Sequence, residues 1–286
     1  MAIAQQTAFE IVKKLGEELT HREFDLPPFP DIAIRVRDAL NDLDVTLDKI
    51  TRIVLSEPVL TSRLLRLANS AMLRRGAMEI TDLRTAISRV GLQMVRNAAA
   101  SMAMDDTFKT PGGSLLRAHM DTTRKHSTQV CALAYTLAKR HADDINPDEA
   151  MLAGLLHDIG KFYILTRVDA HPELFEEEQM LVDLLAEWHT GIGRAIVEAW
   201  GFPEPVADAV YEHETLERQP SGPVEIVDIV IAANLLAHLE DPDYPDLPEL
   251  EQVPSCVRMK LDGETIGIIL EESAEEIQSL TQALGG

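Results

Sequence analysis

The heptapeptide LLHDIGK, at Leu155–Lys161, carries the strongest chemical signal in this sequence. A histidine followed directly by an aspartate on a helix offers an imidazole nitrogen and a carboxylate from adjacent positions, about 100° apart around the axis. Both groups can then bind one metal ion at their shared edge. Lys161 follows His157 by one turn and is therefore placed to contact a phosphate oxygen. The motif predicts a metal-binding site on a helix.

Three further histidines lie where they complete a set of metal ligands. His126 falls on the predicted helix before the heptapeptide, His189 in EWHTGIG and His213 in YEHE. Together with His157 and Asp158, they predict a site for a divalent metal of the Fe, Mn, Zn or Co type. In an active site of this kind the metal would generate hydroxide and orient a phosphate for displacement. In an active enzyme Asp158 would be a catalytic candidate, and Lys161 a catalytic and phosphate-binding one.

Almost every segment follows the helical period. Amphipathic patterns with this period occur at Ser56–Met72, Leu83–Val90, Met94–Met104, His126–Lys139 and Glu264–Leu284. The apolar run Val227–Leu239 is too long for a typical buried strand and is interpreted as a buried helix. The sequence predicts an all-α fold in which an N-terminal helical bundle packs against a second helical bundle.

Stretches rich in proline and glycine divide the chain at Pro27–Pro30, Thr110–Ser114 and Asp241–Pro254. The end segments Met1–Leu26 and Pro254–Gly286 are too short to fold independently, so we expect the chain to form a single folded unit. Its expected parts are an N-terminal helix over residues 1–25, a helical subdomain over 26–110, a second helical subdomain over 115–240, and an acidic linker with a C-terminal helix over 241–286. We expect the C-terminal helix to pack back onto the body.

Charge is distributed unevenly along the chain, whose formal net charge is −22. Asp169–Gly286 contains 4 basic and 27 acidic residues, whereas Arg52–Arg96 contains 8 arginines and 3 acidic residues. Nucleic-acid affinity depends largely on Lys and Arg neutralising phosphates, so the balance argues against duplex nucleic acid as a partner. The arginine-rich segment forms either solvated helix faces or a site for a small anion or an acidic protein.

The helices flanking Gly91 allow an alternative interpretation as a DNA-binding helix-turn-helix. Two packed helices with an intervening glycine are common in any bundle, and the net charge is unfavourable for DNA. The bundle interpretation is therefore preferred.

Cysteine use and the N-terminus indicate a cytoplasmic protein that does not enter a membrane. Cys131 and Cys256 have neither the spacing of a disulfide framework nor that of a thiolate zinc site. The N-terminal residues lack the pattern of a signal peptide. No segment approaches the roughly 18 consecutive apolar residues of a membrane helix.

The succession of motifs resembles the HDOD (HD-related output domain) family of bacterial signalling proteins. The resemblance runs in order through Leu26–Val36, Ser56–Met72, Thr85–Asn97, Leu155–Lys161, His189–Glu214 and Ile229–Ala237. It implies an all-α fold with an HD-like second bundle, related to HD phosphohydrolases and HD-GYP cyclic-di-GMP phosphodiesterases. Family members are generally regulatory. The HD-type metal-ligand positions carried over are His126, His157, Asp158, His189 and His213.

This sequence differs from the HD and HD-GYP enzymes in three features. HD-GYP enzymes have a His-His pair where this chain has Glu212-His213, and a GYP-like loop is missing after His213. HD enzymes place their last aspartate where this chain has Asn234. A neutral amide is a weaker metal ligand than a carboxylate, so metal retention should be reduced. Cyclic-di-GMP hydrolysis is not expected.

Two functions therefore compete. The first is a regulatory, non-catalytic HDOD module that binds signalling proteins of the kinase, cyclase or phosphodiesterase type, with either no cofactor or a divalent metal (Fe, Mn or Zn). The alternative is a metal-dependent phosphohydrolase or phosphodiesterase acting on nucleotides or cyclic dinucleotides. His157 and Asp158 have a further, purely structural interpretation, in which they hydrogen-bond each other and nearby helix ends. His238 has no motif support and is expected on the surface or in the core. Asn69 is expected to form a structural hydrogen bond across a helix interface.

Overall fold

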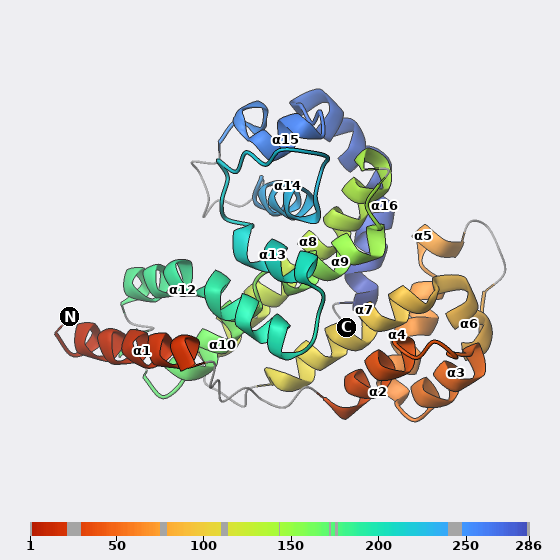
Figure 1. The fold of residues 1–286 in the computed structure, drawn as a ribbon, viewed down its shortest axis with the longest axis horizontal. Helices are drawn as coiled ribbons and strands as arrows, with labels where there is room; N and C mark the ends of the chain where they lie inside the picture. The colour runs from red at the N-terminus through yellow and green to blue at the C-terminus, as the bar shows by residue number, and fades with distance from the viewer. Residues whose placement is uncertain are drawn as a thin grey trace.

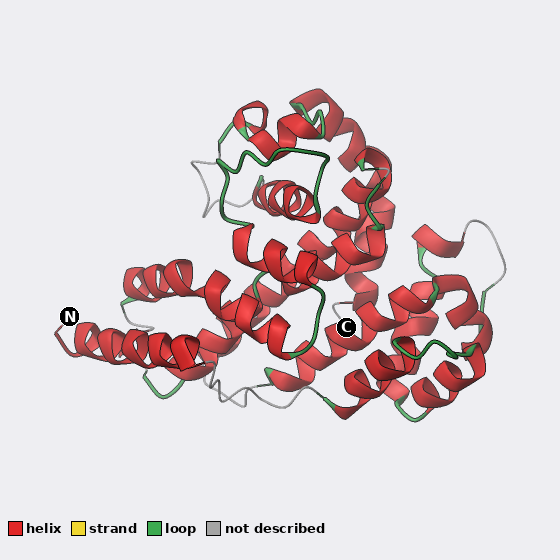
Figure 2. Ribbon diagram, in the orientation of Figure 1, coloured by secondary structure: helices red, strands yellow, loops and turns green. Residues whose placement is uncertain are grey.

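A computed structural model describes the chain over residues 2–21, 30–74, 79–109, 114–142, 144–171, 173–174, 177–239 and 248–284. Every regular element in these ranges is a helix, and none is a strand (Figure 2). The predicted all-α fold is thus confirmed. The three predicted breaks lie mostly outside the described residues.

The N-terminal bundle occupies one end of the molecule, in orange to yellow in Figure 1. It comprises α2 (Asp31–Leu40), α3 (Leu47–Leu55), α4 (Pro58–Ala68), α5 (Ala71–Arg74), α6 (Leu83–Val90) and α7 (Leu92–Thr107). The side chains of Thr46 and Asp82 cap α3 and α6 by accepting hydrogen bonds from backbone N–H groups. The apolar stripe of α4, with Leu60, Leu64 and Leu67 completely buried, forms part of its core.

The predicted helix over Ser56–Met72 is wrong at its end, because α4 stops at Ala68. Asn69 caps it: its amide donates to the Leu65 carbonyl at 3.0 Å and to the Ile80 carbonyl at 2.8 Å. Its Oδ1 accepts from the Ile80 N–H at 2.8 Å. The expected structural hydrogen bond exists, but it binds the backbone before α6 rather than a neighbouring helix.

Gly91 joins α6 to α7 with a φ of 86°, which favours glycine. The helix that follows is buried along most of its length, from Met94 to Met104. A recognition helix must expose one face to the major groove. Because it is buried, α7 does not fit the role of a recognition helix in a helix-turn-helix.

The second bundle is built around α8 (Ser114–His141), the longest described helix. It packs against α9 (Pro147–Leu156), α10 (Ile159–Val168) and α14 (Ile226–His238). A further layer is formed by α12 (Glu178–Ala199), which packs on α10, and α13 (Glu204–Glu212), which packs on α9, α12 and α14. The predicted buried helix at Val227–Leu239 is confirmed by α14, whose residues are nearly all buried.

The two terminal helices pack onto this body. Figure 1 shows α1 (Ala2–His21) beside α12, and the Tyr163 hydroxyl of α10 donates to Glu18 at 2.7 Å. After η1 (Leu250–Gln252) and α15 (Pro254–Arg258), α16 (Gly263–Leu284) runs along α8 and also touches α4 and α5. The C-terminal helix packs back onto the body, as expected, and it contacts both bundles.

A buried polar network joins the bundles. Arg63 of α4 is only 5% exposed and pairs with Asp105 of α7, which also accepts from Arg124 of α8 at 2.7 Å. The Ser101 hydroxyl accepts from Arg63 at 2.9 Å and donates to the Leu284 carbonyl at 3.1 Å. The interpretation of the arginine-rich segment as solvated helix faces is thus wrong for Arg63.

None of the helices described is both long and apolar enough to cross a membrane.

Candidate metal centre

The five predicted ligands converge from five helices. His126 lies on α8 and His189 on α12, while His213 follows the last residue of α13. His157 caps the end of α9, and Asp158 precedes α10 with φ −99° and ψ 13°. The prediction that His157 and Asp158 lie within one helix is therefore wrong. The chain breaks between them, which frees Asp158 from the 100° offset of a continuous helix.

Glycines allow the helices to approach closely enough to form the site. A Cβ atom on Gly160 would lie 2.0 Å from the carbonyl oxygen of His189, and one on Gly193 would lie 2.8 Å from Val210. On the other side, a Cβ on Gly154 would lie 3.0 Å from the Val130 carbonyl oxygen of α8. Backbone contacts of this kind bring the start of α10 against α12.

Backbone carbonyls fix the orientation of three histidines. The Nδ1 atom of His157 lies 2.8 Å from the Gly154 carbonyl, that of His189 2.8 Å from Leu185, and that of His213 2.9 Å from Val210. A carbonyl oxygen can only accept, so Nδ1 carries the proton in each ring. When these rings are neutral, each presents an Nε2 lone pair, which is the arrangement of a metal-ligating histidine.

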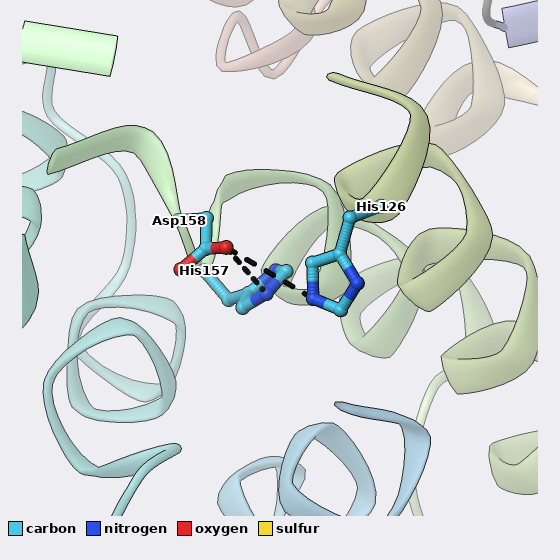
Figure 3. A group of neighbouring side chains, drawn as sticks. All are labelled: His126, His157 and Asp158. Atoms are coloured by element: carbon cyan, nitrogen blue, oxygen red, sulfur yellow. Dashed lines mark ion pairs between the residues drawn. The ribbon is translucent and has the colours of Figure 1, made fainter. Parts of the chain in front are cut away.

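Asp158 lies between two groups of nitrogen atoms, both close enough to share a metal ion with it. Its Oδ1 is 3.6 Å from Nε2 of His189 and 3.6 Å from Nε2 of His213. Its Oδ2 is 3.4 Å from Nε2 of His157 and 3.9 Å from Nε2 of His126 (Figure 3). The predicted single ligand set is thus divided into two groups that share one carboxylate.

In one of the two groups, a candidate ligand nitrogen is already hydrogen-bonded to another side chain. Nε2 of His126 already lies 2.9 Å from Oδ1 of Asn234, which accepts a hydrogen bond from it. The His238 ring stacks on His126 with a centroid separation of 4.3 Å. His238 is buried, four residues after Asn234 on α14, and this spacing places both on the same helix face. That spacing is the signal that could have placed His238 at the site.

Lys161 also contacts Asp158: its Nζ donates to Oδ2 at 2.8 Å. The predicted phosphate-binding side chain is thus engaged with the shared carboxylate in this structure.

Two buried atoms indicate that the site fits a cation. Nε2 of His157 and Oδ1 of Asp158 have no hydrogen-bond partner within the described residues. An unsatisfied buried polar group costs about 1–3 kcal/mol, so such atoms are uncommon in native proteins. Both are atoms that would ligate a metal ion, and nitrogen and carboxylate donors suit Fe, Mn and Zn.

The ionisation of the cluster follows from burial and charge. Burial lowers the pKa of His126 to about 3 and that of His189 to about 4, so both rings are neutral at pH 7. Burial also opposes a charge on His213, but the carboxylates of Asp158 and Glu214 outweigh it and raise its pKa to about 9. Burial would raise the pKa of Asp158, yet His157 and Lys161 hold it well below its usual range. A cation, either a proton on His213 or a metal ion, therefore balances the carboxylates.

The cluster is almost closed to solvent. His157, Asp158, His189 and His213 are at most 1% exposed, whereas the Lys161 side chain is 18% exposed. A cavity of about 300 Å³ lies between α9, α13 and α14, lined in part by Asn146, Asp208 and Arg218, and none of the five ligands lines it.

The fold and site define an all-helical protein of the HD-like type. Its residues 26–216 match the HDOD domain model, and the chain belongs to the HDOD family. A structure of an HDOD domain protein of unknown function from Geobacter sulfurreducens is 29% identical, with a TM-score of 0.71 over 95% of this chain and 97% of that one.

A second structure comes from Shewanella amazonensis SB2B, and its name assigns that protein provisionally to the metal-dependent phosphohydrolases. It is 25% identical, with a TM-score of 0.82 over 99% of this chain and 100% of that one. An uncharacterised protein of Treponema pallidum (strain Nichols) is 26% identical over 84% of this chain. The chain spans about half of that relative, 47% of its length.

Proposed function

We propose that this chain is a regulatory HDOD module of signal transduction that holds a divalent metal in its His–Asp cluster without turning over a phosphoester. It acts by binding another signalling protein, of the kinase, cyclase or phosphodiesterase class. The observation that carries the non-catalytic role is the burial of the cluster, since the four most central side chains are at most 1% exposed. A substrate phosphate needs open contact with a catalytic metal, whereas a structural site is closed.

The charges around Asp158 support the same role. Asn234 provides an amide where hydrolases of the HD type provide a carboxylate, and it engages His126 at 2.9 Å. Lys161 is directed to Asp158 at 2.8 Å. Both interactions are internal to the cluster: the first engages a candidate ligand, and the second engages the side chain that an enzyme would direct to its substrate.

A metal-dependent phosphohydrolase is the second candidate function. It is favoured by the unsatisfied Nε2 of His157 and Oδ1 of Asp158, and by the name of the Shewanella protein. In either function His189, His213 and Asp158 would hold the metal, with His126 and His157 on the other carboxylate oxygen. When bound in an open site, such a metal supplies an activated water for hydrolysis.

The test is a phosphoesterase assay of the metal-loaded chain against a double variant, His157→Ala with Asp158→Ala. The regulatory proposal expects equal, background rates for both proteins. Hydrolysis by the wild type alone would favour the second candidate.

A further inference from the structure

We propose that Glu214 is a metal ligand, which completes the group formed by Asp158, His189 and His213 and forms its solvent-facing side. The inference rests on the proposed metal binding and adds a residue outside the five-residue ligand set. Glu214 directly follows His213, at the turn where α13 has ended, and this turn directs its carboxylate towards the same two imidazoles that face Asp158.

The distances from the two histidines to each other and to each carboxylate match the spacing of ligands around one ion. Oε1 of Glu214 is 3.7 Å from Nε2 of His189 and 3.5 Å from Nε2 of His213, and these nitrogens are 3.2 Å apart. Oδ1 of Asp158 is 3.6 Å from each nitrogen. Ligand atoms about 2.0–2.2 Å from a tetrahedral metal lie roughly 3.3–3.6 Å from one another. The carboxylate of Glu214 therefore lies at ligand spacing from both histidines.

The charge of Glu214 suits the same role. Asn234, at His126, is neutral where HD enzymes have a carboxylate, and Glu214 supplies a carboxylate at His189 and His213. Glu214 forms no ion pair with a lysine or arginine in the described part of the chain. Glu212, two residues earlier, pairs with Arg218 at 2.6 Å. Of these two nearby acids, Glu214 is thus the one directed to the histidines.

Exposure distinguishes Glu214 from the other ligands. Its side chain is 49% exposed, whereas those of His189, His213 and Asp158 are at most 1% exposed. Glu214 is therefore the ligand at the protein surface, and its carboxylate would close the site on that side. Loss of this carboxylate should both weaken binding and change the coordination of the ion.

The experiment compares the full-length wild type with Glu214→Gln, and uses Glu212→Gln as a control that removes an equal charge two residues away. Zn²⁺ affinity is measured by competition with a chromophoric chelator, and Co²⁺ coordination by the visible absorption of the cobalt-loaded protein. We expect the Zn²⁺ Kd of Glu214→Gln to rise about 10–100-fold, the range typical of losing a group that supports a metal site. Its cobalt spectrum should change in intensity and position, while Glu212→Gln should retain the wild-type spectrum.

The possible failures are distinguishable. If the wild type binds Zn²⁺ and Glu214→Gln binds it equally, with an unchanged cobalt spectrum, then Glu214 is not a ligand and the metal site remains. If the wild type binds no Zn²⁺, both the metal site and the role of Glu214 are overturned. Circular dichroism of each variant checks that a weakened affinity does not come from unfolding.

Discussion

Gly160 and the backbone carbonyl of His189 lie so close together that a Cβ atom at residue 160 would be 2.0 Å from the carbonyl oxygen. The contact joins the first turn of α10 to the middle of α12. It therefore sets the position of Asp158, two residues before Gly160, relative to the imidazole of His189. Gly160, the glycine of LLHDIGK, is therefore required for α10 to pack against α12, and this packing positions Asp158 in the site.

Replacing Gly160 with alanine should destabilise the protein by about 3 kcal/mol or more, at the upper end of typical overpacking costs. The neighbouring atoms belong to the backbone and cannot rotate away. Gly191, on α12, is the matched control, because a Cβ atom there would meet no described atom within 4 Å apart from its chain neighbours and the nearby backbone of its own helix. Gly191→Ala should be stabilising by up to about 1 kcal/mol. Urea denaturation measures both, and equal stability of the two variants would refute the packing account.

Asp228 is a buried charge outside the cluster whose loss should be strongly destabilising. It is fully buried, accepts from Ser255 at 2.8 Å and from Arg258 at 3.2 Å, and caps α14 through the Glu225 N–H at 2.9 Å. Asp228→Ala should destabilise the chain by about 3–5 kcal/mol, since it leaves buried partners unpaired. Glu17→Ala, which breaks an exposed pair with Lys13, should change stability by less than about 1 kcal/mol. Thermal unfolding compares the two, and a similar small effect of both would contradict the prediction.

Asn234→Asp should strengthen metal binding on the His126 side of the cluster, because a carboxylate is a stronger metal ligand than a neutral amide. A carboxylate at residue 234 would replace the amide that now accepts from His126, and would add a negative charge beside that ring. We expect total Zn²⁺ binding to increase, with a second ion bound or the affinity raised about tenfold or more. Elemental analysis after dialysis measures the stoichiometry. An unchanged metal content and affinity would show that Asn234 does not limit the site.

Metal removal should lower stability. An ion that binds only the folded chain contributes about 2.7 kcal/mol when its free concentration is 100 times its Kd. Chelator-treated wild type should therefore melt at a lower temperature, and the loss should be restored by added Zn²⁺. A His189→Ala, His213→Ala double variant should show no such restoration. Differential scanning calorimetry measures the shift, and its absence in the wild type would exclude a stabilising metal.

Much of the fold follows from local sequence, because the helical period directly determines which side chains are buried. The period places Leu60, Leu64 and Leu67 on one helix face, and all three are completely buried. It does not predict the end of α4, because that end depends on Asn69 binding the backbone of Ile80, eleven residues later. Arg63 shows the same limit: its burial depends on Asp105, 42 residues away.

The sequence predicts which residues form most of the candidate site, but not how they are arranged. The motifs identify the four histidines and Asp158, whereas they do not predict the helix break after His157. They do not single out Glu214 either, because its approach to His189 arises from the packing of α13 against α12. Only the assembled helices divide the ligands into two groups around one carboxylate.

The most direct test of the central claim is hydrolysis by the metal-loaded chain. Wild type, loaded separately with Mn²⁺, Fe²⁺ or Zn²⁺, is incubated with a phosphate monoester, a phosphodiester, nucleotides and a cyclic dinucleotide, beside the His157→Ala, Asp158→Ala double variant. The account predicts metal bound to the wild type and no product above the double variant. Turnover near 1 s⁻¹ or faster, in the ordinary enzymatic range and lost in the double variant, would contradict it.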